Sequence, residues 1–371
     1  MQKLIELKKD DRLLVSSQVE GFLKPDFVYL PVENKTILVH QNDQVKMGDE
    51  VIDGILSPIS GVVHSLQKKD SYHFAGYFLE IQNDFEEQRQ QERGIKRKLT
   101  KESVLSMLAL EGKKNLVLNA IDDEIYVSTE NFYLFCHYEH FLELLDEIAQ
   151  LFVLDRVYVC LKASSSENIN QLMSDLGMYP NIILKVVPDL YLLGKTRFLL
   201  SYLGLDEEDT LVVMASQFYQ IYNLLKRGRT LNDQLITISG DAIKNPMIVQ
   251  VKIGSLLSDV VKELIQFKEE DVLYFANGLM AGKEIVLDHF VVTPDLSSLL
   301  IMKKKKTVKA EKCLNCGLCR EICPVRLNPK LFSNAKYLRK VKDQCLKCGL
   351  CSYICPVYIN FNVYLEGENH E

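Results

Sequence analysis

The sequence predicts a multidomain protein of mixed α/β and β architecture that ends in a cysteine-rich tail. With 371 residues, of which 47% are hydrophobic, the chain is long enough to form two or three separate cores. Its texture changes along its length, and eight of its ten cysteines lie between Cys313 and Cys355. The predicted units are a β-rich module at 1–84, an α/β domain at 85–230, a β-grasp-like unit at 231–302 and a tail at 303–371.

The first unit has the pattern of a compact set of β-hairpins. The stretches "FVYLPV", "TILVHQNDQVKMGDEVI" and "SPISGVVHSL" alternate apolar and polar residues and are broken at Gly48, Pro58 and Gly61. This pattern resembles the barrel-sandwich hybrid of biotinyl-lipoyl modules. No lysine lies between Asp53 and Leu66, where such a module would present its carrier lysine, so we interpret the module as structural.

The second unit alternates strands and helices. After the charged stretch "NDFEEQRQQERGIKRKLTKES", interpreted as a solvated linker or helix face, the apolar runs "NLVLNAI", "RVYVCLKA", "NIILKVV" and "DTLVVMA" predict strands. Between them "HFLELLDEIAQLF", "ENINQLMSDLG" and "TRFLLSYLG" predict helices, and "FYQIYNLLKRG" follows. Short β-branched runs between amphipathic segments indicate a parallel sheet flanked by helices.

The third unit is short and simple. "QLITISGDAIKNPMIVQVKIGSLLSDVVKELI" predicts two strands around a turn at Gly240 and Pro246, followed by a helix from Ser255. Two strands and a helix within about thirty residues suggest a β-grasp-like unit. The lysine-rich "IMKKKKTVKAEK" is interpreted as a soluble hinge to the tail.

Charge is distributed unevenly between body and tail. Residues 303–371 contain 14 Lys and Arg against 6 Asp and Glu, a net charge of +8, and residues 1–302 carry −14 (30 against 44). A basic rim on the tail can guide an acidic redox carrier, whereas no recognition motif for nucleic acid accompanies it. No run approaches eighteen apolar residues, and "MQKLIELKKDDRLLVSSQ" lacks a secretory core, so we expect a cytoplasmic protein attached to a membrane only through a partner.

The tail repeats one cysteine motif 32 residues apart. "CLNCGLCREICPVRLNP" and "CLKCGLCSYICPVYINF" both read C-x2-C-x2-C-x3-C-P, in which three thiolates hold one cubane cluster and the fourth reaches the other cluster. Structural zinc usually uses two C-x2-C pairs a dozen or more residues apart. The motif therefore favours two [4Fe–4S] clusters. The predicted ligands are Cys313, Cys316, Cys319 and Cys355 for one cluster, and Cys345, Cys348, Cys351 and Cys323 for the other.

Other candidate sites are weak. Cys136 in "FYLFCHYEH" and Cys160 in "RVYVCLKA" are interpreted as buried, inert thiols, and the histidines beside Cys136 as core packing rather than a metal site. "GLMAGK" from Gly278 has too few glycines for a phosphate loop, and neither G-x-G-x-x-G nor a P-loop occurs. No catalytic residue is identified from spacing alone.

Taken together, these motifs make the chain similar to the RnfC family, which supplies one subunit of the Rnf complex, an ion-translocating ferredoxin:NAD oxidoreductase. The resemblance runs through "NLVLNAIDDEIYVSTEN", "VVMASQFYQIYNLLKRGRTLNDQLITISGDAIKNP" and the two cysteine segments. It implies an α/β domain like that of the NADH dehydrogenase 51 kDa subunit, a soluble-ligand-binding (SLBB) β-grasp module and a bacterial-ferredoxin-like dicluster domain.

The chain departs from the family where FMN and NADH bind. The family's glycine-rich loop is replaced by "GIKRKLTKESVLSMLALEGKKN", which has glycine only at 94 and 112. Bulky side chains there prevent the backbone from closing around a phosphate or flavin. The acidic turn has become Asp122, Asp123 and Glu124, without the family's cysteine and proline. We therefore expect the FMN and NADH site to be lost, with flavin binding through an altered loop as the open alternative.

The resemblance implies a peripheral electron-transfer subunit on the cytoplasmic face of a membrane-bound complex. Its expected partners are the other subunits and a soluble carrier, ferredoxin or flavodoxin, and it would act as the redox subunit of a translocase without a catalytic site of its own. Two alternatives stay open: a cobalamin-reductase-like flavoprotein, and a non-catalytic assembly or redox-sensing subunit.

Overall fold

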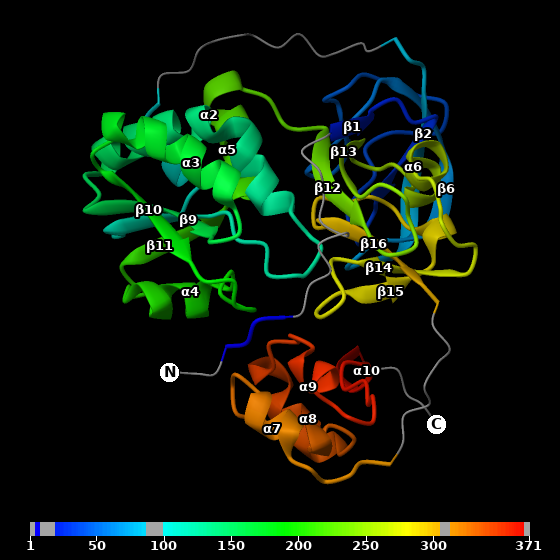
Figure 1. Cartoon of the computed structure of the whole chain (residues 1–371). Coiled ribbons are helices and arrows are strands. Elements are labelled where there is room, and N and C mark those ends of the chain that lie inside the picture. The colour runs from blue at the N-terminus through cyan, green and yellow to red at the C-terminus, as the bar shows by residue number, and fades with distance from the viewer. Residues whose placement is uncertain (1–3, 8–18, 87–98, 305–311, 367–371) are drawn as a thin grey trace.

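The computed structural model describes residues 4–7, 19–86, 99–304 and 312–366 and has the mixed α/β architecture that the sequence predicts. A helix-flanked sheet and a β-rich part lie side by side, and the cysteine tail lies below both (Figure 1). Within the described ranges, every helix is too short or too polar to span a membrane.

The β-rich part begins with a four-stranded antiparallel sheet and a small hairpin. The sheet order is β2-β7-β6-β3, and β4 pairs with β5. These strands are β2 (Phe27–Pro31), β3 (Gln44–Val45), β4 (Glu50–Ile52), β5 (Ile55–Leu56), β6 (Gly61–Asp70) and β7 (Ala75–Asn83). Their alternating apolar residues, among them Val28, Val51 and Ile81, form a core of their own, as expected for strands that face solvent on one side.

A six-stranded mixed sheet completes the β-rich part. Its order is β1-β13-β12-β16-β14-β15, with α6 (Leu257–Leu264) packed against it. The strands are β1 (Val19–Phe22), β12 (Asp233–Ser239), β13 (Met247–Lys252), β14 (Val272–Ala276), β15 (Lys283–Ile285) and β16 (Ser298–Lys303). The antiparallel pair β12 and β13 joined by a turn, followed by a helix, agrees with the sequence pattern. Strand β1 was not anticipated, because four residues carry no signal of the distant strand, β13, with which they pair in parallel.

The predicted parallel sheet is present. Its order is β10-β9-β8-β11, and all three pairings are parallel. The strands are β8 (Asn115–Asn119), β9 (Arg156–Lys162), β10 (Ile182–Val187) and β11 (Thr210–Met214). The helices are α1 (Lys101–Leu105), α2 (Thr129–Phe152), α3 (Ser166–Asp175), α4 (Thr196–Leu203) and α5 (Ala215–Tyr222), and α5 continues into a π-helical turn, Asn223–Arg227. Phe141 and Phe218 pack edge to face in the core, with ring centroids 5.2 Å apart.

The tail is built from two similar halves. Its helices are α7 (Leu318–Ile322), α8 (Ala335–Val341), α9 (Leu350–Tyr353) and α10 (Val363–Glu366). Three pairs of residues 32 positions apart share a left-handed backbone: Asn315 and Lys347, Gly317 and Gly349, and Arg326 and Tyr358. Leu327, Phe332, Phe361 and Leu365 form the core between the halves. The repeated sequence therefore folds as a repeated backbone.

Candidate iron–sulfur site

The eight tail cysteines surround two neighbouring cavities in groups of four. A cavity of about 160 Å³ is lined by Cys313, Cys316, Cys319 and Cys355, and one of about 20 Å³ by Cys323, Cys345, Cys348 and Cys351. Each group takes three cysteines from one half of the repeat and the fourth from the other half. The structure thus assembles the same two groups that the sequence suggests, while their binding of iron stays a prediction.

The donors in these groups fit an iron–sulfur cluster better than a single ion. Among the described residues, no three His, Cys, Asp or Glu side chains lie close enough to share one metal ion. A cubane spreads its four thiolate contacts over four irons, which suits sulfurs placed around a cavity. The larger cavity has the volume of roughly five waters. The smaller one must widen to take a cluster.

The thiols nearest the protein body are shielded from water. Burial raises the pKa of Cys348 to about 11 and that of Cys351 to about 12. These thiols therefore keep their protons at neutral pH when no metal is bound, and metal binding would release them. The backbone N–H of Leu327 donates to Cys323 Sγ at 3.3 Å, the type of bond that helps to set the potential of a bound cluster.

The two cysteine loops differ in their surroundings although their sequences match. Leu350 in the second loop is 1% exposed and packs with the body, whereas its counterpart Leu318 in the first loop is 38% exposed. Leu314, next to Cys313, is 61% exposed. We call the first loop the outer loop and the second the inner loop. One copy of the motif is therefore docked on the body, and the other presents the same apolar residues to solvent.

Close backbone contact holds the inner loop. A Cβ built on Gly349 would lie 2.0 Å from the carbonyl oxygen of Met280, so only glycine allows this approach, while a Cβ on Gly317 in the outer loop would meet nothing within 4 Å. Asn362 Nδ2 also donates to the Met280 carbonyl at 3.3 Å.

A buried tyrosine joins the inner loop to the acidic turn. The Tyr191 hydroxyl lies 2.8 Å from the carbonyl oxygen of Cys348 and 3.2 Å from Glu124 Oε1. The Glu124 carboxylate in turn accepts the backbone N–H groups of Met280 (2.9 Å) and Ala281 (2.8 Å). Burial raises the pKa of both Glu124 and Tyr191. This network links the parallel-sheet domain, the six-stranded sheet and the tail.

The rest of the acidic turn also binds backbone N–H groups of the chain itself. Asp122 accepts from Glu130 and Asn131 in the first turn of α2, both at 3.0 Å, and Asp123 accepts from Gly194 at 2.7 Å. Burial raises the pKa of both aspartates. Backbone N–H groups at helix starts and glycine turns are those that bind phosphates in nucleotide sites. Here the protein's own carboxylates occupy them.

Glu130 completes this pattern at the start of α5. Its carboxylate accepts the Ser216 backbone N–H at 2.8 Å and the Ser216 hydroxyl at 2.7 Å. Burial raises its pKa to about 7, and the charge of Asp122 adds to the effect. The acidic groups on this edge of the sheet thus act as structural anchors.

The weaker candidates from the sequence have structural explanations. His137 stacks on Tyr219 with ring centroids 3.9 Å apart, and His140 stacks on Tyr222 at 5.0 Å, in line with packing rather than metal binding. Cys160 is buried as predicted. The prediction for Cys136 was wrong: it is exposed, because its neighbours Phe132, Tyr133 and Leu134 take the inner face of α2.

Comparisons with curated proteins point in one direction. The RnfC component of the proton-translocating ferredoxin:NAD(+) oxidoreductase complex of Clostridium ljungdahlii is 33% identical over 115 residues, which are 30% of this chain and 25% of that protein. Its Na(+)-translocating counterpart in Acetobacterium woodii is 30% identical over 112 residues, with the same coverage. The corresponding component of the ion-translocating oxidoreductase complex of Rhodobacter capsulatus is 22% identical over 237 residues, 61% of this chain and 46% of that protein. The chain is RnfC-like.

The likeness is partial in extent. The RnfC-like chain spans between a quarter and a half of the length of these relatives, and no family model matches it. A chain of the NAD+-reducing [NiFe]-hydrogenase in its air-oxidized state has a TM-score of 0.50 with 13% identity, over 69% of this chain and 56% of that one. At this identity the likeness concerns the fold alone.

Sequence reasoning missed the residues that dock the tail. Tyr191, Met280 and Asn362 lie far from the cysteines or carry no motif, so no local signal marks them. "GLMAGK" was set aside as a phosphate loop. Its backbone does hold an anion, but the anion is the Glu124 carboxylate.

Glu130 yields a pH prediction. Its folded-state pKa of about 7 exceeds the ordinary 4.5, so between these values the folded chain keeps a proton that the unfolded chain has released. The stability from this group is present below pH 4.5 and is lost as the pH rises through 7. Glu130→Gln cannot ionise and should remove up to about 3 kcal/mol of that loss, measured by urea unfolding from pH 4 to 8.

The control for this experiment is Glu111→Gln, an exposed site in the same domain whose pH dependence should match the unmodified chain. An unchanged slope in Glu130→Gln would show that this carboxyl ionises normally in the folded state.

Proposed function

We propose that the chain is a peripheral electron-transfer subunit on the cytoplasmic face of a membrane-bound, ion-translocating oxidoreductase complex. The observation that carries this proposal is the pair of four-cysteine groups around adjacent cavities. Its RnfC-like character supports the placement in such a complex, since the relatives are named as subunits of ion-translocating complexes.

Two [4Fe–4S] clusters, when bound, would supply a pair of one-electron carriers close to each other. The chain's own residues fix the position of this pair. The inner cysteine loop is held against the body through Gly349, Leu350 and Tyr191. The outer loop faces solvent with Cys313 and Cys316 exposed. Electron exchange with a partner would therefore take place at the outer loop.

The surface around the outer loop suits an acidic redox protein. Residues 312–366 contain nine Lys and Arg against three Asp and Glu, a net charge of +6 (9 minus 3). Exposed apolar residues, Leu314 and Leu318, lie among these cations. An apolar contact within a positive rim favours rapid, specific association with a partner of negative potential. Ferredoxin, flavodoxin or an acidic subunit of the complex has this character.

The RnfC-like chain is proposed to work without FMN or NADH of its own. The carboxylates of Asp122, Asp123 and Glu130 occupy the backbone N–H groups that a phosphate would need at this edge of the sheet. An anionic cofactor there would meet these acids. The chain would thus relay electrons for the complex rather than oxidise a nicotinamide.

The crossing of ligands between the halves can be tested directly. In anaerobically reconstituted protein, Cys355→Ser should disturb the same cluster as Cys316→Ser, because both residues line the larger cavity. Cys323→Ser should instead match Cys348→Ser. The readout is the EPR spectrum and midpoint potential of the cluster that remains. A spectrum of Cys355→Ser that matches Cys348→Ser would mean that each half binds its own cluster.

Membership of a membrane complex predicts salt-sensitive recovery. An affinity-tagged chain from gently solubilised membranes should co-purify with membrane-embedded redox subunits at low salt and lose them at about 1 M salt, where the Debye length is about 3 Å. Lys312→Glu, beside Cys313 and outside the cavity lining, should lower the recovery several-fold at unchanged iron content. Lys35→Glu, an exposed site on the first sheet's loop, makes the same charge change and should have no effect. Recovery of the chain alone at low salt would contradict the assignment.

A further inference from the structure

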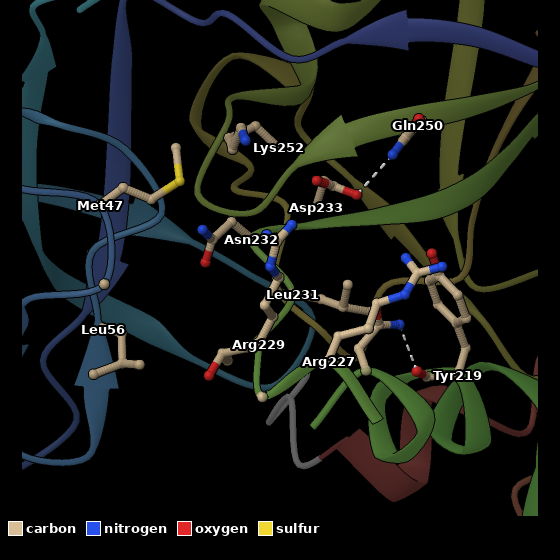
Figure 2. Close-up of a pocket in the computed structure, with 14 residues that line it drawn as sticks. Met47, Leu56, Tyr219, Arg227, Arg229, Leu231, Asn232, Asp233, Gln250 and Lys252 are labelled. Carbon is tan, nitrogen blue, oxygen red and sulfur yellow. Dashed lines mark hydrogen bonds between the residues drawn. The ribbon is translucent and has the colours of Figure 1, made fainter. Parts of the chain in front are cut away.

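A second cavity lies far from the cysteines in the sequence and belongs to no part of the relay. It has a volume of about 340 Å³, within the range of small-molecule sites. Three parts of the chain contribute to it: the first β-hairpins through Met47 and Leu56, the end of α5 and its π-helical turn, and the β12–β13 pair. Figure 2 shows these parts facing one another across the space.

The lining of this cavity is basic. Arg227, Arg229 and Lys252 contribute three positive charges and Asp233 one negative charge, a net charge of +2 (3 minus 1). Residues 1–302 as a whole carry −14 (30 against 44), so the cavity reverses the local sign of charge. Converging cations in a concave, partly dry site attract anions more strongly than the same charges spread over a surface.

Lys252 is the most telling member of the set. It is only 8% exposed, which is rare for lysine because burying its charge is costly without compensation. Asp233 lies opposite it in the antiparallel register of β12 and β13. The Gln250 amide also donates to Asp233, at 2.8 Å. The single acid of the cavity is thus engaged by its neighbours, and the two arginines add positive charge beyond what it balances.

The backbone beside the arginines is unusual in a way that often marks function. Asn223–Arg227 forms a π-helical turn, which is rare and frequently occurs at functional sites. The turn ends at Gly228, whose φ of +66° turns the chain so that Arg227 and Arg229 both line the cavity. Tyr219 borders the space and is held by stacking on His137, and Figure 2 shows Arg227 reaching beside its ring.

We propose that this cavity binds a small phosphate-bearing molecule, up to about the size of a mononucleotide. Arginine guanidinium groups match phosphate oxygens in two-point hydrogen bonds, and a lysine ammonium adds a point charge. Asn232, whose side chain faces the cavity in Figure 2, supplies a neutral donor. The site joins the first sheet, the α/β domain and the six-stranded sheet, so the ligand also bridges the three units.

Calorimetric titration of the full-length, cluster-loaded chain tests this proposal. AMP and inorganic pyrophosphate serve as probes, and citrate serves as a phosphate-free anion of similar charge. At least one of the two phosphates should bind at one site per chain. Arg227→Gln and Arg229→Gln should each weaken that binding about tenfold, the size expected for the loss of a charge-assisted hydrogen bond. Lys252→Gln should weaken it at least as much.

Lys268→Gln, an exposed lysine of the same sheet unit, removes an equal charge away from the cavity and should leave the affinity unchanged. Because the exposed Arg227 is not part of any core, its variant keeps the test valid if Lys252→Gln fails to fold. Absence of binding for both phosphates would overturn the proposal. So would equal affinity in the arginine variants, or citrate binding as tight as that of the phosphates.

Discussion

The docking of the inner cysteine loop on the body is the contact on which the arrangement of this molecule depends. Gly349 packs against the Met280 carbonyl, and the Tyr191 hydroxyl bridges the Cys348 carbonyl to the Glu124 carboxylate. One hydroxyl proton serves two acceptors there, with the shorter contact to Cys348. Because a cysteine backbone is fixed in this way, one group of four thiols is tied to the body and the other is directed outward.

The acidic turn shows how a ligand-binding edge can become a structural one. Carboxyl ends of parallel strands gather backbone N–H groups that often bind phosphates. In this chain Asp122, Asp123, Glu124 and Glu130 take up those groups from within. Burial raises the pKa of each of these side chains, so the arrangement stores a sensitivity to pH but leaves no N–H group of this set for an external anion.

Local patterns made much of the fold predictable. Apolar runs between amphipathic segments located all four strands of the parallel sheet, and the repeated cysteine spacing indicated the two groups of four in the tail. Long-range pairings were not predictable, because strand β1 and Tyr191 act through partners more than 150 residues away. The exposure of Cys136 was missed since an apolar sequence does not tell which face of a helix is inward. The basic cavity was missed because its lining comes from three distant segments.

A close pair of iron–sulfur clusters, held by the eight tail cysteines, is the central feature of the proposed function. Iron and acid-labile sulfide analysis of the anaerobically purified chain, combined with low-temperature EPR of the reduced protein, tests it most directly. We expect about eight irons and eight sulfides per chain, and a spectrum broadened by magnetic interaction between two neighbouring reduced clusters. Stoichiometric zinc, or a well-folded chain without iron, would contradict this expectation.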